Sequence, residues 1–197
     1  MDTGLFFGSF NPIHIGHIAL ANYMREFIPL KEVWFVVSPQ NPLKGKDSLL
    51  SAHHRMAMVR IAIESQKGFK ASNIEFGLPT PSFTIHTLAH LWEKYPKKQF
   101  GLILGADNLR SFHKWKNYEQ ILAQSKLLVY PRKGYGGGDL EHHQNVIITQ
   151  APEIEVSSQF IRQGIADGKN MNGFLSESVA TYLQEMKFYT KNRKIAG

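Results

Sequence analysis

The feature that most constrains this chain is the ten-residue segment GSFNPIHIGH at residues 8–17, which follows a short apolar run at residues 4–7. After the segment, apolar residues recur with the i, i+3, i+4, i+7 spacing of one helix face: Leu20, Tyr23, Met24 and Phe27. The sequence therefore predicts a strand, a tight loop and a helix in direct succession. Two histidines, His14 and His17, would stand at the entrance of that helix.

A loop of this composition is suited to binding a phosphate chain. The first turn of a helix has N–H groups without an internal partner and a partial positive charge, so anions bind there. Gly8 and Gly16 lack side chains and allow a ligand to approach the backbone closely. His14 and His17 are three residues apart, so on the opening turn they would point to the same side and donate to phosphate oxygens. A metal pair is the competing interpretation, but two histidines without Cys, Asp or Glu partners are a poor ligand set, and we predict no metal bound by the protein.

Strand-like and helix-like segments alternate along the rest of the chain. We expect strands at 33–37, within 69–76, at 100–104, 127–130 and 146–148, and helices at 51–64, 82–95, 109–113, 118–124, 158–166 and 176–187. This alternation predicts an α/β fold: a Rossmann-like, doubly wound, mostly parallel sheet flanked by helices, with a small C-terminal helical portion. Without an internal repeat or linker, residues 1–197 are predicted to form one domain, with 188–197 a flexible basic tail.

Three loops of the predicted sheet follow strands: residues 8–17, 38–44 and 105–107. In open parallel sheets ligands bind beyond the carboxyl ends of the strands. These loops should therefore share one rim, and that convergence indicates a nucleotide cleft.

Composition narrows the class of protein further. A net charge of +7 favours polyanionic ligands, and the basic residues form no long block, so we expect small phosphate compounds rather than nucleic acid. The absence of cysteine excludes disulfides and thiolate chemistry. No 18-residue apolar run and no signal peptide are visible, so we expect a cytoplasmic protein without a membrane partner.

The segment 8–17, written Gly8-Ser9-Phe10-x-Pro12-x-His14-x-Gly16-His17, resembles the signature of the superfamily of nucleotidyltransferases that join a nucleotide to a phosphorylated acceptor. Within it the chain most resembles the bacterial nicotinate mononucleotide adenylyltransferases of NAD biosynthesis. The segment VSSQFIR at residues 156–162 resembles the family's second signature, Ile-Ser-Ser-Thr-x-Ile-Arg, with Gln159 in place of the threonine.

The resemblance implies three groups of functional residues. The catalytic group is His14, His17 and Arg162. The ATP-binding group is Gly8, Ser9, Phe10, Gly16, Gly105, Asp107, Ser157, Ser158 and Ile161. The mononucleotide-binding group is Lys44, Thr84, Thr87, Trp115 and Arg132. The polar neighbours of Trp115 predict a partly exposed ring, and Leu43 stands where the family commonly has a histidine.

The reaction that the resemblance implies is transfer of the adenylyl group of ATP to nicotinate mononucleotide, giving nicotinate adenine dinucleotide and pyrophosphate. The acceptor is a phosphate monoester with a second pKa of about 6, so it is already a dianion at neutral pH and needs no general base. Magnesium would bridge the ATP oxygens without a dedicated protein cage. Another acceptor, such as phosphopantetheine or a polyol phosphate, and a non-catalytic nucleotide-binding regulator are the alternatives. The preference for nicotinate over nicotinamide mononucleotide and the presence of a homo-oligomer are left open.

Overall fold

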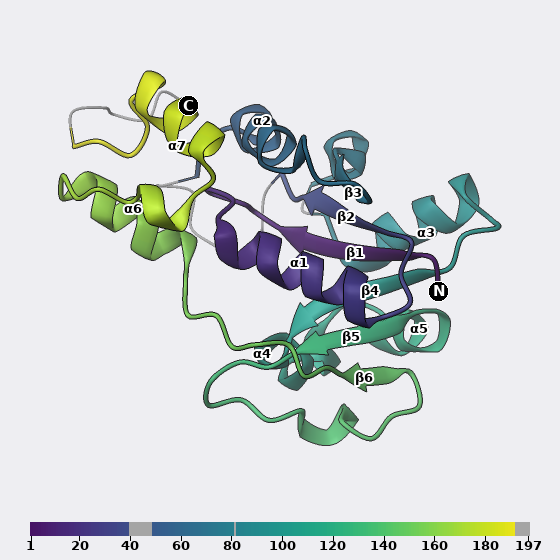
Figure 1. Cartoon of the computed structure of the whole chain (residues 1–197). Coiled ribbons are helices and arrows are strands. Elements are labelled where there is room, and N and C mark those ends of the chain that lie inside the picture. Colours follow the sequence, from purple (N-terminus) through teal and green to yellow (C-terminus); the bar gives the residue numbers. More distant parts are fainter. Residues whose placement is uncertain (40–48, 81, 192–197) are drawn as a thin grey trace.

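The computed structural model describes residues 1–39, 49–80 and 82–191, and the predicted Lys44 lies outside them. Its centre is a six-stranded parallel sheet of order β3-β2-β1-β4-β5-β6 (Figure 1). The strands are β1 Thr3–Gly8, β2 Glu32–Val37, β3 Phe69–Ser72, β4 Phe100–Gly105, β5 Lys126–Tyr130 and β6 Val146–Ile148. The order reverses between β1 and β4, as in the doubly wound dinucleotide-binding folds. The predicted Rossmann-like class is confirmed.

Seven α-helices lie among the described residues. They are α1 Ile15–Phe27, α2 Ala52–Ile63, α3 Thr84–Lys94, α4 Ala106–Arg110, α5 Tyr118–Gln124, α6 Ser158–Ala166 and α7 Glu177–Glu185. Residues of α1, α2, α6 and α7 belong to one hydrophobic core, and residues of α3, α4 and α5 to the other. Figure 1 shows α6 and α7 beyond the carboxyl end of β1, where they form the C-terminal helical portion.

The central strands read as continuous apolar runs because both faces of the sheet are covered. Along β2, Val33 and Phe35 pack into the first core, whereas Trp34 and Val36 pack into the second. Alternate residues of a strand point to opposite faces, so each run supplies both cores at once. The central strands are therefore packed on both faces of the sheet.

Three expectations need correction. The helix predicted at residues 109–113 is instead α4, which begins earlier, at Ala106. A separate 3-10 turn follows it at Phe112–Lys114. Phe27 is 70% exposed rather than part of the inner stripe of α1, because it lies in the last turn, where its ring stacks on Tyr23. The predicted flexible tail does not start at residue 188: Phe188 is buried in the first core.

Candidate active site

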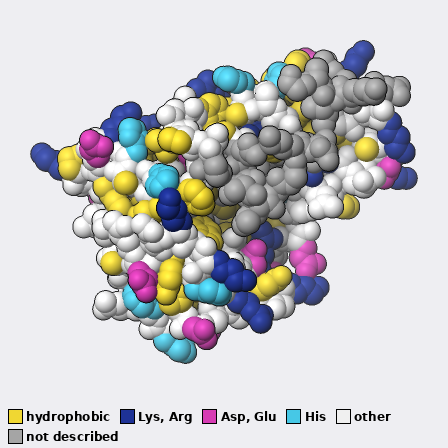
Figure 2. All heavy atoms as spheres, turned by 180° about the vertical axis from the view of Figure 1, so that it is seen from behind, with side chains coloured by type: hydrophobic (Ala, Val, Ile, Leu, Met, Phe, Trp, Pro, Cys, Tyr) yellow, Lys and Arg dark blue, Asp and Glu magenta, His cyan; other side chains and the backbone are white. Residues whose placement is uncertain are grey.

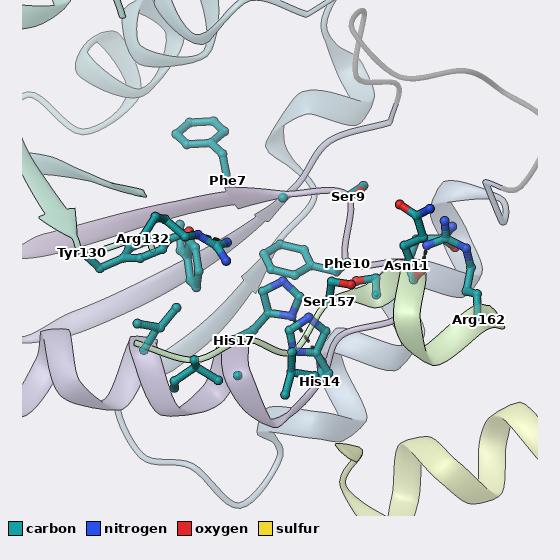
Figure 3. Close-up of a pocket in the computed structure, with 18 of the residues that line it drawn as sticks. Phe7, Ser9, Phe10, Asn11, His14, His17, Tyr130, Arg132, Ser157 and Arg162 are labelled. Carbon is teal, nitrogen blue, oxygen red and sulfur yellow. Dashed lines mark hydrogen bonds between the residues drawn. The ribbon is translucent and has the colours of Figure 1, made fainter. Parts of the chain in front are cut away.

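A cleft of about 670 Å³ opens at the carboxyl rim of β1. It brings together the loop after β1, the start of α1, the end of β5 and the start of α6 (Figure 3). Ten of the predicted site residues line it: Gly8, Ser9, Phe10, His14, Gly16, His17, Arg132, Ser157, Ser158 and Arg162. The two sequence signatures, about 150 residues apart in the chain, thus form one site.

The loop after β1 turns sharply at Phe10, which has a positive φ of 45° and a ring that is almost fully buried. A Cβ atom on Gly8 would lie 2.8 Å from that ring, so only glycine leaves room for it. The ring packs edge-on against His17, at 5.0 Å between centroids. A non-glycine residue in the left-handed region is strained, and such strain persists where packing fixes the backbone. The loop is therefore held in one shape beside the cleft.

His14 and His17 meet at the N-terminus of α1, where His14 is the N-cap residue. The backbone N–H of His14 donates to Nδ1 of His17 at 3.2 Å. Because Nδ1 accepts, the neutral ring of His17 carries its proton on Nε2. The two ring centroids are 3.7 Å apart, and both imidazoles lie in the cleft (Figure 3).

Burial, together with the nearby charge of Arg132, lowers the pKa of His14 from its usual value of 6.5 to about 4. His14 is therefore a neutral imidazole at neutral pH when the cleft holds no anion. A negatively charged ligand would act in the opposite direction and raise this pKa.

The start of α6 is docked onto the loop after β1. Ser157 caps the helix by accepting from the N–H of Phe160, and Ser158 Oγ donates to the carbonyl of Pro12 at 2.8 Å. Arg162 Nη1 donates to the carbonyl of Asn11 at 2.8 Å. Both signatures thus depend on the same short loop for their relative position.

Arg132 stands at the opposite side of the histidines from Arg162 (Figure 3). Its guanidinium lies 5.2 Å from the ring centre of Tyr130, and its Nε is 3.9 Å from Asp107 Oδ1. A Cβ on Gly105 would meet Asp107 Oδ1 at 2.3 Å and would also crowd Tyr130 and Arg132. Gly105 and Asp107 therefore lie next to Arg132 at the same rim of the sheet. They do not line the cleft.

The remaining predicted residues lie elsewhere. Thr84 begins α3 and is half-buried, and Trp115 is half-buried against Phe112 as its polar neighbours predicted. Two further predicted residues have buried side chains. Thr87 is fully buried and its hydroxyl donates to Glu75 at 2.7 Å, because it faces inward from α3.

The second of these residues is Ile161, whose side chain is fully buried in the first core. It lies on the inner face of α6, away from the cleft. Its side chain anchors the helix that carries Arg162 and has no access to a ligand.

Sequence reasoning missed Arg55, Asn11 and Tyr189. Arg55 is fully buried in α2 and donates to backbone carbonyls of the loops at the cleft. Asn11 lies inside the first signature and accepts from three other segments. The sequence did contain a signal for Arg55. It is a charged residue one helical turn before Val59, on the otherwise apolar face of α2.

The positive charge of the site comes from a few side chains that line the cleft. Figure 2, the view from behind Figure 1, shows Lys and Arg side chains at several separate places on the surface, with Asp, Glu and His side chains between them. In the cleft, by contrast, Arg132 and Arg162 flank the two histidines and the N-terminus of α1. This arrangement favours a compact anion such as a nucleotide phosphate chain.

No three His, Cys, Asp or Glu side chains among the described residues come together in a way that could hold a metal ion. Within the same residues, no helix has both the length and the apolar character that a membrane crossing requires.

The model of the cytidylyltransferase-like family matches residues 5–164, which include the sheet and both signatures. The chain belongs to this family. Its bacterial relatives include two proteins named "Probable nicotinate-nucleotide adenylyltransferase". That of Christiangramia forsetii is 50% identical over 95% of this chain and 97% of the relative. That of Flavobacterium psychrophilum is 48% identical over 97% of this chain and all of the relative. The resemblance found in the sequence is confirmed.

Two solved structures of one enzyme share the fold of this chain. The nicotinic acid mononucleotide adenylyltransferase of Plasmodium falciparum complexed with NaAD has a TM-score of 0.81 at 18% identity, covering 95% of this chain and 97% of that one. The same enzyme complexed with APC has a TM-score of 0.80, with 95% and 96% covered. The overall fold, over nearly the full length of both chains, is thus that of these solved structures.

Proposed function

We propose that this protein transfers the adenylyl group of ATP to nicotinate mononucleotide, forming nicotinate adenine dinucleotide and pyrophosphate. The observation that carries the proposal is the convergence of His14, His17, Arg132 and Arg162 around the N-terminus of α1. The near-full-length relatives that bear the name of this activity support it.

The reaction forms one bond and breaks one. A phosphate oxygen of the mononucleotide attacks the α-phosphorus of ATP, and the bond from that phosphorus to the bridging oxygen of the β-phosphate breaks. Pyrophosphate leaves with the electron pair. Because the attacking phosphate is already a dianion, the protein has to align the two substrates and stabilise negative charge rather than remove a proton.

The cleft offers groups for this task at four points. His17 donates from Nε2 and His14 from its neutral ring, and both act beside the N–H groups that open α1. Arg162 keeps one donor on Asn11 and has further N–H groups for the triphosphate. Ser157 and Ser158 place the N-terminus of α6 against the same anion.

An occupied cleft would change the state of His14. Its low pKa arises from burial and from Arg132, and the phosphate charge of ATP would favour the protonated form. Protonation on binding would add a charged hydrogen bond to the α-phosphate as its charge develops in the transition state.

By the resemblance, we assign the mononucleotide to Arg132, Thr84 and Trp115, and also to Lys44, which lies outside the described residues. Trp115 keeps part of its ring exposed, as a stacking partner for a pyridine ring must. Magnesium would enter as part of the MgATP substrate, held by phosphate oxygens.

The test is to mix the protein with ATP, magnesium and either nicotinate or nicotinamide mononucleotide, and to follow both dinucleotides by chromatography. Rapid dinucleotide formation establishes the reaction, and the ratio of the two rates establishes the acceptor. Pyrophosphate release with phosphopantetheine or a polyol phosphate instead would assign another acceptor. ATP binding without any product would make the protein a nucleotide-binding regulator.

A further inference from the structure

Arg55 is a buried cation. Among the described residues, its side chain donates hydrogen bonds to backbone carbonyl oxygens. Its Nε donates to the carbonyl of Leu50 at 2.9 Å, and its Nη1 donates to the carbonyls of Ser9 at 2.6 Å and Ser38 at 2.8 Å. Its Nη2 donates to the carbonyl of Pro39 at 2.7 Å. One planar guanidinium thus joins the loop after β1, the loop after β2 and the segment leading into α2.

This arrangement uses a property that only arginine has. The guanidinium presents five N–H donors in a fixed fork, so it can hold carbonyls from several directions at once. Burial lowers the pKa of Arg55 to about 10, which leaves the group charged at neutral pH. With no exposed surface, the side chain has no contact with a ligand in the cleft. Its effect on the site is the position that it gives to Ser9.

Tyr189 fixes the same loop from the other end of the chain. Its hydroxyl donates to Asn11 Oδ1 at 2.7 Å, and the backbone N–H of Leu50 donates to the same oxygen at 3.2 Å. The carbonyl of Asn11 meanwhile accepts from Arg162. Phe188 is buried next to Tyr189, so the segment after α7 is packed onto the molecule where it reaches Asn11.

We propose that Arg55 and Tyr189 are positioning residues of the phosphate cleft. Arg55 sets the place of Ser9 through its carbonyl, and Tyr189 sets the place of Asn11 and, through it, of Arg162. The C-terminal segment is thus a working part of the ATP site rather than an appendage. The test of this inference by kcat rests on the proposed function. The test by the Kd for an ATP analogue requires only that the protein binds ATP.

The decisive variant is Tyr189→Phe, which removes one hydroxyl and keeps the ring. The matched control is Tyr182→Phe on α7, whose hydroxyl forms a 2.8 Å hydrogen bond with His54 of α2 and does not reach the loop after β1. Both variants lose one hydrogen bond between the C-terminal region and the rest of the protein. We expect each to lower the melting temperature by a similar few degrees.

Only Tyr189→Phe should change the site. We expect its Kd for a non-hydrolysable ATP analogue, measured by calorimetry, to rise about threefold or more, and its kcat to fall about fivefold or more. Both quantities should stay within about twofold of wild type in Tyr182→Phe. Equal effects in the two variants, or none in Tyr189→Phe, would overturn the inference.

Arg55→Lys provides a second variant, with the exposed Arg60→Lys of the same helix as its control. Lysine keeps the charge but cannot hold the carbonyls of Ser9, Ser38 and Pro39 together. We expect about a tenfold loss of kcat/KM for ATP in Arg55→Lys, measured where circular dichroism shows a folded protein. A loss in Arg60→Lys of the same size would contradict the assignment.

The two proposals fail separately. If the wild type binds the ATP analogue but makes no dinucleotide, the proposed function falls and the calorimetric comparison still tests the positioning role. If the wild type is active and Tyr189→Phe has wild-type Kd and kcat, the positioning role falls and the function stands.

Discussion

The rings of His14 and His17 lie face to face at the entrance of α1, with centroids 3.7 Å apart and planes inclined by 30°. Two imidazolium ions at this distance would repel one another. Burial keeps His14 neutral, so the pair carries at most one positive charge until an anion arrives. The pair can therefore gain charge on substrate binding, and the first two predictions concern it.

We expect His17→Ala to lower kcat by about tenfold or more, because a donor to the reacting phosphates is lost. The fold should survive with a modest loss of stability, since the substitution also removes one hydrogen bond, from the N–H of His14. Steady-state kinetics and thermal melting measure both effects. His142→Ala, an exposed histidine, is the control, and a near-normal kcat in His17→Ala would remove the histidine from the mechanism.

The pKa of His14 predicts how stability depends on pH. The folded state holds it at about 4 and the unfolded state near 6.5, so between these values only the unfolded chain takes up the proton. Stability is thus lost as pH falls from 6.5 towards 4, by about 3 kcal/mol in total.

Urea unfolding at several pH values measures this dependence, with His14→Asn as the variant that cannot titrate. The fall in unfolding free energy between pH 7 and pH 4 should be smaller in His14→Asn by about 2 to 3 kcal/mol. Parallel curves for the two proteins would show that His14 is not buried in its neutral form.

Gly16→Ala should impair activity more than stability. A Cβ there would lie 3.0 Å from His14 Nδ1 and 3.1 Å from Ile154, so the His14 ring has to move. Alanine also favours the helix by about 1 kcal/mol, which offsets the crowding in the melting temperature. We expect kcat to fall about tenfold. Gly77→Ala is the matched control, because a Cβ there meets nothing within 4 Å, and its kinetics should equal those of wild type.

Arg162→Lys should raise the KM for ATP about tenfold, because one ammonium cannot hold the Asn11 carbonyl and two phosphate oxygens together. The KM for the mononucleotide should change by less than about twofold. Initial rates with each substrate varied in turn separate these effects. An unchanged KM for ATP would restrict Arg162 to its structural contact with Asn11.

Trp115→Ala tests the assignment of the pyridine ring. Loss of a stacking partner costs about 1 to 3 kcal/mol for nucleobases, so we expect about a tenfold rise in the KM for the mononucleotide. The KM for ATP should stay the same. Phe27→Ala, an aromatic residue 70% exposed at the end of α1, is the control, and equal effects in the two variants would refute the assignment.

The sequence determined much of the fold. Runs such as residues 33–37 have the length and the apolar character of strands that are covered on both faces, and the helical stripes between them require the two layers of a doubly wound sheet. Parallel strands place their carboxyl ends at one rim, and so the position of residues 8–17 and of the segment around Gly105 at the same rim was predictable.

The sequence also determined where the phosphate chemistry lies, because both signatures carry it in local patterns. Ser157 caps α6 and the two histidines open α1 through contacts within a few residues, which a local pattern can encode. The burial of Thr87 and Ile161 was not predictable in this way. A helix faces its core on a side that depends on neighbours far away in the chain.

Only the tertiary structure decided how the cleft is held and charged. The hydrogen bond from Arg55 to Ser9 joins residues 46 apart, and that from Tyr189 to Asn11 joins residues 178 apart. The low pKa of His14 likewise depends on burial and on Arg132, which follows β5 and lies 118 residues further along the chain. Such contacts follow from packing rather than from any local pattern, so the sequence located the site, whereas the folded structure set its geometry and its charge.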